Sequence, residues 1–597
     1  MPPPAPLLDA VTPGGFLLVL SLVVPVAGAL LAFVAGGRQI ERIALGTMPL
    51  GLAIAVAIAV VMPQAGGPLV YLLGGWAPPL GVALRADGLS VVMMLMTAVV
   101  ICAVGVFARA DFHTPAGSAE SRATFAFWIL LLGVWSGLNT VFLSGDMFTL
   151  YVALELLTFA AVPLVCLDGR AETLQAALRY LLFALLGSVL YLAGAVLLYG
   201  VYGTLDIVLL SQRAHADTAT LIAAALMTVG LLAKTALVPL HLWLPPAHAG
   251  APAAASAVLS ALVVKGSFFI VVRLWFDVMP KLPGYGAGQL LSALGAAAIV
   301  FGNLVALRQR RLKLLIAYST LAQIGYLFLM FGLAFDPVSA RLSSGGALAG
   351  GIMQAISHAT AKAAMFMAAG LIYAALGHDR IVDLAGIGRV LPVSVLAFAL
   401  GGVALMGVPP SGAYAAKELL LQAATETGQW WWAVVLQAGG VLTSSYLFLV
   451  LACALAPASE PIAVRAPVPF VREAAALGLA LCSLLLGLVH LGAYLPVPAG
   501  VRSSSFNLDG VWKVLWPVLA GVALAILLGR WGDRPPPVPL AAAIDRLVRP
   551  TRRPVLALGG IVEGADGVLR QWPAAGLSLL LIAVIFAAAM LAAGGGP

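Results

Sequence analysis

Apolar runs of about 20 residues recur along almost the whole chain, and they limit its fold more than any other feature. Each run is long enough for one α-helix to cross the hydrocarbon core of a bilayer. With 62% hydrophobic and only 9% charged residues, the 597-residue chain cannot hide so much apolar surface in a soluble core. We therefore predict an all-α, polytopic membrane protein of about 16 transmembrane helices.

Arginine and lysine residues predict the orientation of these helices. They gather in every second connection between the apolar runs, from the pair Arg38 and Arg42 to the group Arg308, Arg310 and Arg311. Because basic connections stay on the cytoplasmic side, both termini are expected outside, in a bacterial-type inner membrane. The formal net charge of +8 follows from the same rule. It therefore indicates the lipid bilayer and no nucleic acid as the partner.

Neither a cofactor nor a metal ion is predicted in this chain. Its four cysteines stand singly inside apolar runs, without a CxxC or a Cys/His cluster. No soluble insertion is long enough for a catalytic domain. The one long polar link, 531–573, is basic, and Leu540, Ile544 and Leu547 share one face of a helix that could lie along the membrane surface. A Pro/Arg-rich linker without helix is the alternative, since Pro550 and Pro554 would cut a helix short.

Two lysines lie in the stretch 231–273, where two apolar runs meet at a loop rich in proline, histidine and glycine. A lysine in the middle of a membrane helix costs about 2.5–3.5 kcal/mol on insertion scales, so Lys234 and Lys265 call for a functional reason. Helices broken by proline next to ionisable groups commonly form ion or substrate sites. We predict such a site here, with His241 and His248 of the loop as supporting groups. The alternative is a helix hairpin whose lysines reach the membrane surface.

Further ionisable residues lie inside other predicted helices. Glu155 falls about two turns inside its helix, where no terminus explains it. His358 and Lys362 are four residues apart and share one helical face. Lys417 follows a second break, Pro-Pro-Ser-Gly, although Lys417 and Glu418 would also suit a helix that restarts at an interface. Arg179 lies near a cytoplasmic helix end and is a further supporting candidate.

The two breaks lie about five helices apart, an odd offset that reverses the direction of the second one. This spacing predicts an inverted repeat of five-helix units. The expected divisions are 1–122 for the N-terminal helices, 123–278 for the first half-channel, 279–456 for the second, and 457–597 for the C-terminal helices with their basic linker.

Six motifs in this chain resemble the antiporter-like subunits of respiratory complex I, membrane-bound hydrogenases and Mrp-type sodium/proton antiporters. They are GGWAPPLGVALRADGLS, SGDMFTLYVALE, AKTALVPLHLWLPPAHAGAPAAASAVLSALVVKG, RRLKLLIAYSTLAQIGY, SHATAKAAMFMAAG and GVPPSGAYAAKE. Two departures are a Phe-Thr-Leu where Phe-Asn-Leu is commoner, at 148–150, and Arg179 where a lysine is frequent.

The resemblance implies a role for each candidate. Glu155 matches the essential glutamate, Lys234 its partner lysine and Lys265 the central lysine. His358 matches the histidine of the connecting region, and Lys417 the lysine or glutamate that ends the outer half-channel. In this interpretation Glu155 stabilises protonated Lys234, and opening the pair passes the proton along the chain, with Lys362 as a further carrier.

The function implied is proton translocation by one membrane subunit of a complex I-related electron-transfer complex, of the NADH/quinone or hydrogenase type. The energy would come from other subunits, such as a redox arm, since this chain has no redox or nucleotide-binding motif. The same motifs also fit a subunit of an Mrp-type sodium/proton antiporter, energised by the ion gradient alone, or a proton channel that energises another uptake complex.

Overall fold

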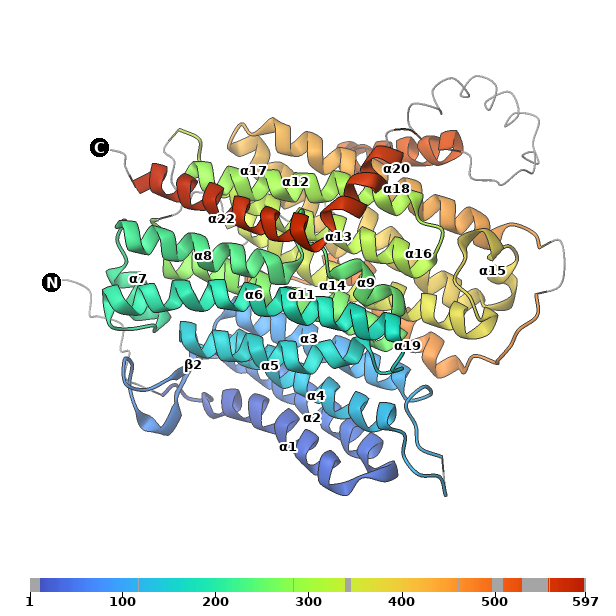
Figure 1. Ribbon diagram of the computed structural model, residues 1–597, viewed down its shortest axis with the longest axis horizontal. Coiled ribbons are helices and arrows are strands. Elements are labelled where there is room, and N and C mark those ends of the chain that lie inside the picture. The colour runs from blue at the N-terminus through green and yellow to red at the C-terminus, as the bar shows by residue number, and fades with distance from the viewer. Residues whose placement is uncertain are drawn as a thin grey trace.

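Long helices lie side by side across the whole computed structural model (Figure 1). It describes residues 11–115, 117–282, 284–338, 345–458, 462–496, 508–528, 557 and 559–594. Within these residues, fourteen helices are long and apolar enough to cross a membrane, and two shorter apolar helices cover Pro392–Met406 and Leu515–Leu528. Together they give the sixteen spans that the apolar runs predicted. The part of the linker on which the surface-helix prediction rests, 531–556, lies outside the described residues.

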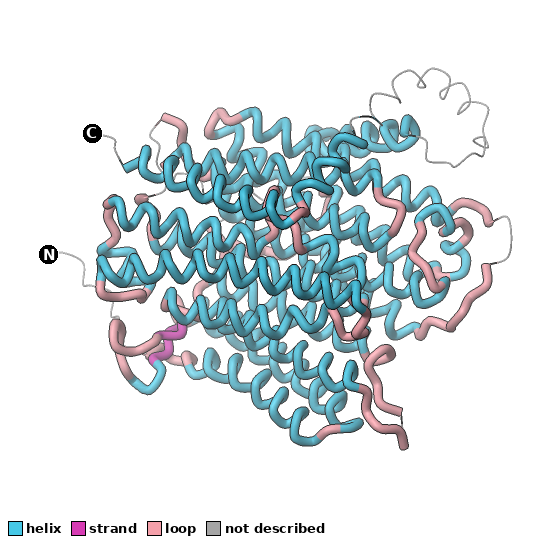
Figure 2. Tube along the Cα trace, viewed as in Figure 1, coloured by secondary structure: helices cyan, strands magenta, loops and turns pink. Residues whose placement is uncertain are grey.

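The N-terminal third supplies six spans and a small hairpin (Figure 2). The spans are α1 (Phe16–Ala35), α2 (Gly37–Gln64), α3 (Gly88–Ala108), α4 (Arg122–Leu143), α5 (Met147–Val165) and α6 (Ala171–Tyr202). Between α2 and α3, β1 (Leu69–Leu72) pairs antiparallel with β2 (Ala83–Ala86), so that Leu69 faces Ala86, and η1 (Leu73–Gly75) follows β1. The all-α prediction holds for the spans but did not include this hairpin, which lies at the end of the molecule where the N-terminus is marked.

The middle of the chain contains the first break. It comprises α7 (Ile207–Arg213), α8 (Thr218–Thr235), α9 (Leu244–Gly250), α10 (Ala253–Val258), η2 (Leu259–Val263), α11 (Val264–Val272) and η3 (Arg273–Val278). The last four form one continuous span, buried except for Phe276 and Asp277 near its end, in which η2 and η3 have the wider π-helical turn. Wider turns of this kind are frequent at functional sites.

The second half repeats the pattern. Its elements are α12 (Tyr285–Arg308), α13 (Leu312–Leu333), α14 (Gly345–Leu376), η4 (Ile381–Asp383), α15 (Ile387–Val390), α16 (Pro392–Met406), α17 (Gly412–Glu426), α18 (Trp430–Leu455), α19 (Phe470–Leu485), η5 (Leu486–Leu488), α20 (Leu508–Leu528) and α22 (Trp572–Gly594). The second break separates α16 from α17. α1 begins at the same side of the molecule at which α22 ends (Figure 1).

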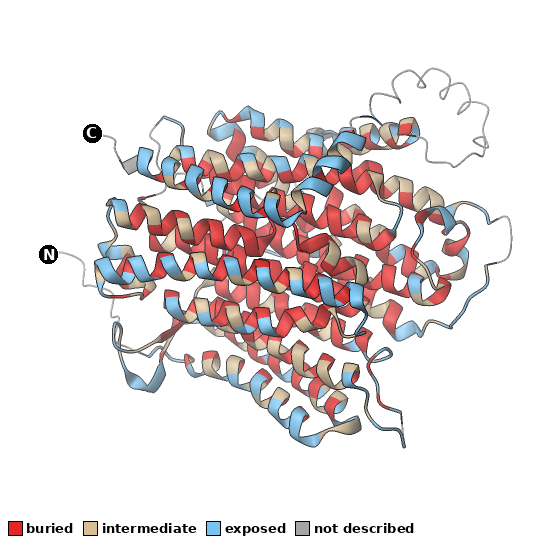
Figure 3. Cartoon of the chain, in the orientation of Figure 1, coloured by how far each residue is buried: buried red, intermediate tan, exposed pale blue. Residues whose placement is uncertain are grey.

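Burial divides the helices into an inner and an outer group. In Figure 3 the helices at the centre are buried on all sides, whereas α1, α6 and α22 expose one side along their length. Almost every residue of α13 and α14 is buried, although both helices carry ionisable or polar side chains. An apolar outer surface facing lipid and a polar-containing interior are what a membrane protein requires.

Candidate functional site

The first break sets the position of Lys234. α8 ends one residue later, at Thr235, and Ala236 takes a left-handed conformation with φ of 58°. Such a conformation is unusual for a residue other than glycine and turns the chain sharply away from the helix axis. The indole nitrogen of Trp243, at the start of α9, donates to the Ala233 carbonyl at 3.0 Å. The broken helix therefore closes back on the turn that holds Lys234.

Lys234 meets Glu155 inside the membrane domain. Its Nζ lies 3.2 Å from Oε1 of Glu155 and 2.9 Å from Oγ1 of Thr158, one turn further along α5. Ser188 of α6 donates a hydrogen bond to the same Glu155 oxygen. The two charged side chains are 6% and 15% exposed, so each has the other as its main electrostatic partner. Arg179, on α6, is half-buried and makes no hydrogen bond or ion pair within the described part of the chain.

A hydroxyl pair connects this region to the next lysine. The Thr235 hydroxyl donates to the hydroxyl of Ser267 at 2.9 Å. Ser267 lies on α11, two residues after Lys265. Sequence reasoning missed both hydroxyls, because serine and threonine are common in membrane helices and carry no charge to single them out.

Lys265 is completely buried at the centre of the molecule. Its Nζ lies 2.6 Å from the Ser260 carbonyl and 2.5 Å from Nδ1 of His358, on α14. The carbonyl belongs to the π-helical η2, whose wider turn directs it toward the lysine amine. If Nδ1 accepts from the amine, the imidazole carries its proton on Nε2, which has no hydrogen-bond partner among the described residues. The histidine can thus take a proton on one side and release one on the other.

Lys362 and His248 extend this buried polar region. The amine of Lys362, one turn after His358, lies 2.5 Å from Oγ of Ser319 on α13. His248, on α9, stacks on the Phe366 ring at 4.8 Å, and neither ring nitrogen has a hydrogen-bond partner among the described residues. A buried imidazole with two free nitrogens is a site that water can satisfy.

The second break positions Lys417. α16 ends at Gly407, with φ of 80°, and the Ser411 hydroxyl caps α17 by accepting from the Tyr414 amide at 3.1 Å. Lys417 follows in the second turn of α17 and has no hydrogen-bond partner among the described residues. Its amine lies against Gly440 of α18, where a Cβ atom would be only 2.7 Å away. The neighbouring Glu418 instead accepts from the Tyr414 hydroxyl at 2.8 Å.

The C-terminal segment reaches the first break through an aspartate that sequence reasoning missed. Asp566, in the helical stretch before α22, is 1% exposed. One carboxylate oxygen lies 3.0 Å from Nε2 of His241 and the other accepts from the Tyr318 hydroxyl at 2.6 Å. His241 belongs to the loop between α8 and α9, and Arg570 forms an ion pair with Asp566 at 2.8 Å. The C-terminal segment 457–597 thus contacts the loop of the first break directly.

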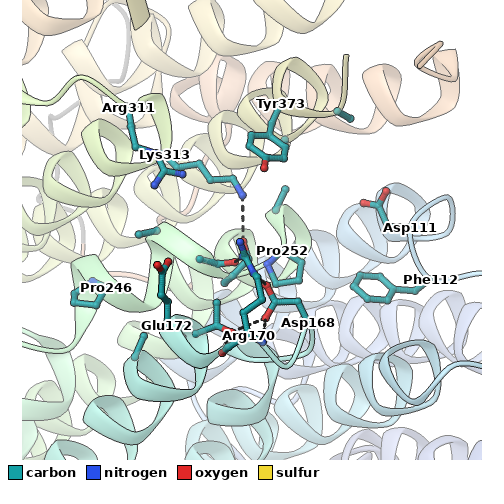
Figure 4. Close-up of a pocket in the computed structure, with 18 of the residues that line it drawn as sticks. Asp111, Phe112, Asp168, Arg170, Glu172, Pro246, Pro252, Arg311, Lys313 and Tyr373 are labelled. Carbon is teal, nitrogen blue, oxygen red and sulfur yellow. Dashed lines mark hydrogen bonds and ion pairs between the residues drawn. The ribbon is translucent and has the colours of Figure 1, made fainter. Parts of the chain in front are cut away.

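A cavity of about 530 Å³ opens beside α9 at the end of the molecule rich in arginine (Figure 4). Lys313 projects into it and donates to the Ala251 carbonyl at 3.1 Å, next to the ring of Tyr373. From sequence, Lys313 was only a basic residue that marks one side of the membrane; the structure shows it 7% exposed. On the opposite wall Asp168 pairs with Arg170. Burial alone would raise the pKa of Asp168, but hydrogen bonds from Thr173 and Arg170 have the larger combined effect and leave the pKa below its ordinary value. This carboxylate therefore stays ionised.

No group of three or more metal-ligating side chains occurs among the residues that the structure describes. The chemistry available in the buried region is proton transfer between amines, an imidazole, a carboxylate and hydroxyls.

Comparisons with known proteins cover the part of the chain that contains both breaks. Residues 144–443 match the family described as NADH:quinone oxidoreductase/Mrp antiporter, TM. NADH-quinone oxidoreductase subunit N of Desulforudis audaxviator is 33% identical, over 66% of this chain and 77% of that protein. A Na(+)/H(+) antiporter subunit of Alkalihalophilus pseudofirmus is 28% identical, over 72% of this chain and 84% of that protein. A chain in the structure of the Mrp complex from Dietzia sp. superposes with a TM-score of 0.70 at 24% identity, over 86% of this chain and 97% of that one, which shows a shared fold.

Proposed function

Because the chain belongs to the NADH:quinone oxidoreductase/Mrp antiporter transmembrane family, we propose that it is the proton-translocating subunit of a multisubunit membrane complex related to respiratory complex I. The observation that carries this function is the buried series of titratable groups, from Glu155 and Lys234 through Lys265 and His358 to Lys417. Burying several amines in an apolar interior is costly, so we infer that each amine takes part in proton transfer.

The half-channels correspond to the two breaks. We assign 123–278, with Glu155 and Lys234, to the first and 279–456, with Lys362 and Lys417, to the second, while Lys265 and His358 connect them. The segments 1–122 and 457–597 flank this pair. Protons reach the first half-channel from the cytoplasm through the cavity beside α9, whose lining includes Arg170, Arg311 and Lys313, basic residues of the connections expected on that side.

Transfer starts at the ion pair. While Glu155 contacts Lys234, the carboxylate stabilises the protonated amine. Separation of the pair removes that stabilisation, and the proton passes toward Lys265. Because the groups act as a coupled set, a proton belongs to the series rather than to one residue at a time. The driving energy comes from partner subunits, and this chain itself requires no cofactor for the transfer.

An Mrp-type sodium/proton antiporter subunit is the second candidate, favoured by the similarity to the Alkalihalophilus pseudofirmus antiporter protein over 84% of its length. The two functions differ in what drives transport. A complex with redox subunits pumps protons when it receives electrons, without added sodium. An antiporter moves protons only in exchange for sodium and needs no electron donor.

We also propose that both termini lie outside the cytoplasm of a bacterial-type inner membrane. The alternation of basic connections supports this, and α1 begins at the same side of the molecule at which α22 ends. A phosphatase fused after Pro597 should be active. A fluorescent protein fused at the same position should stay dark, because it would be exported before it folds. Cytoplasmic fluorescence from that fusion would contradict the orientation.

The test of the function is Lys265→Ala, with the whole complex reconstituted in proteoliposomes. Proton pumping should fall to background while the complex assembles, since no neighbouring side chain replaces the central amine. Lys281→Ala is the matched control, because Lys281 is exposed in the connection after the same span, and it should pump normally. Normal pumping by Lys265→Ala would contradict the proposed function.

A further inference from the structure

A second cavity of about 440 Å³ lies at the arginine-rich end of α2, α3 and α19, and it shares Arg472 with the cavity beside α9. Its charged and titratable lining residues are Arg38, Glu41, Arg42, Arg109, His113 and Arg472. Glu120 lies near the start of α2, where it accepts a hydrogen bond from the Gly37 amide, and does not line the cavity.

The acidic groups here satisfy only part of the positive charge. Glu41 pairs with Arg109 at 2.7 Å, and the Arg109 side chain is 69% exposed. Arg38 and Arg42 form no hydrogen bond or ion pair through their side chains within the described residues. The cavity thus has two uncompensated guanidinium groups at its rim.

Arg472 adds a buried donor on the inner side. Its side chain is 9% exposed, one nitrogen lies 2.5 Å from Asp111, and its guanidinium lies over the Phe107 ring at 4.5 Å. The remaining Nε is buried and has no hydrogen-bond partner among the described residues. A buried guanidinium nitrogen without a partner indicates a missing acceptor, because leaving such a donor unpaired is costly.

An apolar stripe leads from this cavity along α3. Leu95, Val99 and Val106 recur at helical spacing on one face; the first two are half-buried, and Val106, which lines the cavity, is 41% exposed. α3 packs against α2 on one side and α19 on the other, and Val471 of α19, also in the lining, is 60% exposed. The basic cavity therefore continues into a partly exposed apolar strip on α3 and α19.

We propose that this cavity binds the phosphate of an anionic phospholipid, with an acyl chain lying along the stripe of α3. Arginine forms paired hydrogen bonds with phosphate oxygens, and basic pockets between membrane helices on the cytoplasmic side suit anionic headgroups. A free phosphate ion would use the guanidinium groups but not the apolar stripe, so the two parts together select a lipid. The bound lipid joins the N-terminal helices to α19.

The experiment measures lipid retained by the whole purified complex, using native mass spectrometry after release from nanodiscs that contain phosphatidylglycerol. The wild-type complex should retain phosphatidylglycerol. The double variant Arg38→Gln/Arg42→Gln should weaken retention by about 30-fold, because each arginine near an anionic headgroup strengthens binding about 5-fold. Arg310→Gln with Arg380→Gln is the matched control. It removes two exposed arginines elsewhere, and retention should stay unchanged.

Three results would overturn the proposal: equal retention by the Arg38/Arg42 variant and the wild type, equal loss in the control variant, or release of the lipid by inorganic phosphate alone. Should the Arg38/Arg42 variant fail to assemble, the wild-type complex still provides a test. Its thermal stability should be higher in phosphatidylcholine vesicles containing phosphatidylglycerol than in phosphatidylcholine alone, and no difference would reject the lipid site.

Discussion

The two helix breaks carry lysines in opposite surroundings. Lys234, at the first break, has a carboxylate partner in Glu155 at 3.2 Å and a hydroxyl in Thr158 at 2.9 Å. Lys417, at the second, has no hydrogen-bond partner among the described residues and only the space left by Gly440. A paired amine is held in its protonated form, whereas an amine without a partner depends on water for its charge. We infer that the first break stores a proton and the second one releases it.

The largest effect should come from breaking the pair at the first break. Glu155→Ala leaves Lys234 without its carboxylate, at a cost of about 3–5 kcal/mol for a fully buried pair, unless the lysine loses its proton. We expect loss of most proton pumping by the assembled complex in proteoliposomes, while Glu155→Asp retains some.

The double variant Glu155→Ala/Lys234→Ala tests whether the two residues form one unit. It should pump about as poorly as either single variant, because groups that act together have non-additive effects. Losses that multiply would show two independent roles and remove the contrast between the breaks.

At the second break, the identity of the titratable group should matter less. Lys417→Ala should block proton release, while Lys417→Glu should retain part of the pumping, because neither a partner charge nor a fixed hydrogen bond selects for an amine there, within the part of the chain that is described. Pumping by both variants in proteoliposomes checks this. Equal and complete loss in the two would mean that the positive charge itself is required.

An intermediate effect is expected at Asp566, which holds the loop of the first break. Asp566→Asn keeps the size of the side chain but weakens its bonds to His241 and Tyr318, each worth about 1.5–3 kcal/mol when one partner is charged. We expect a lower thermal stability of the complex and slower pumping. Glu563→Gln, in the same helical stretch but 48% exposed, is the control and should change neither by much. Unchanged stability and pumping in Asp566→Asn would show that the contact has no role at the break.

The smallest effect should come from Gly440→Ala, which places a methyl group 2.7 Å from the Lys417 amine. The flexible lysine can move aside, so the protein should fold, but a displaced amine should slow pumping by roughly 10-fold. Gly200→Ala, with open space around its Cβ position, is the matched control. An unaffected rate in Gly440→Ala would mean that the position of Lys417 is not constrained.

Much of this contrast could be predicted from the sequence, because charges inside apolar runs and prolines inside helices are visible without a structure. The sixteen spans and both breaks follow from those signals alone. The contact between Asp566 and His241 could not be predicted, since the two residues are 325 positions apart and an aspartate near a polar linker looks like an ordinary surface residue. The π-helical turn before Lys265 could not be predicted, because no residue type in it is specific to such a turn. Lys313 resembled the many basic residues expected to face the cytoplasm.

The central claim is that Lys234, held by Glu155, is the proton donor to the rest of the series. Proton uptake and electron transfer should be measured together in proteoliposomes containing the whole complex with Lys234→Ala, after assembly has been verified. The account predicts that the complex forms and that pumping is almost abolished. Near-normal pumping by this variant would contradict the account and leave Lys234 as a buried lysine without a part in translocation.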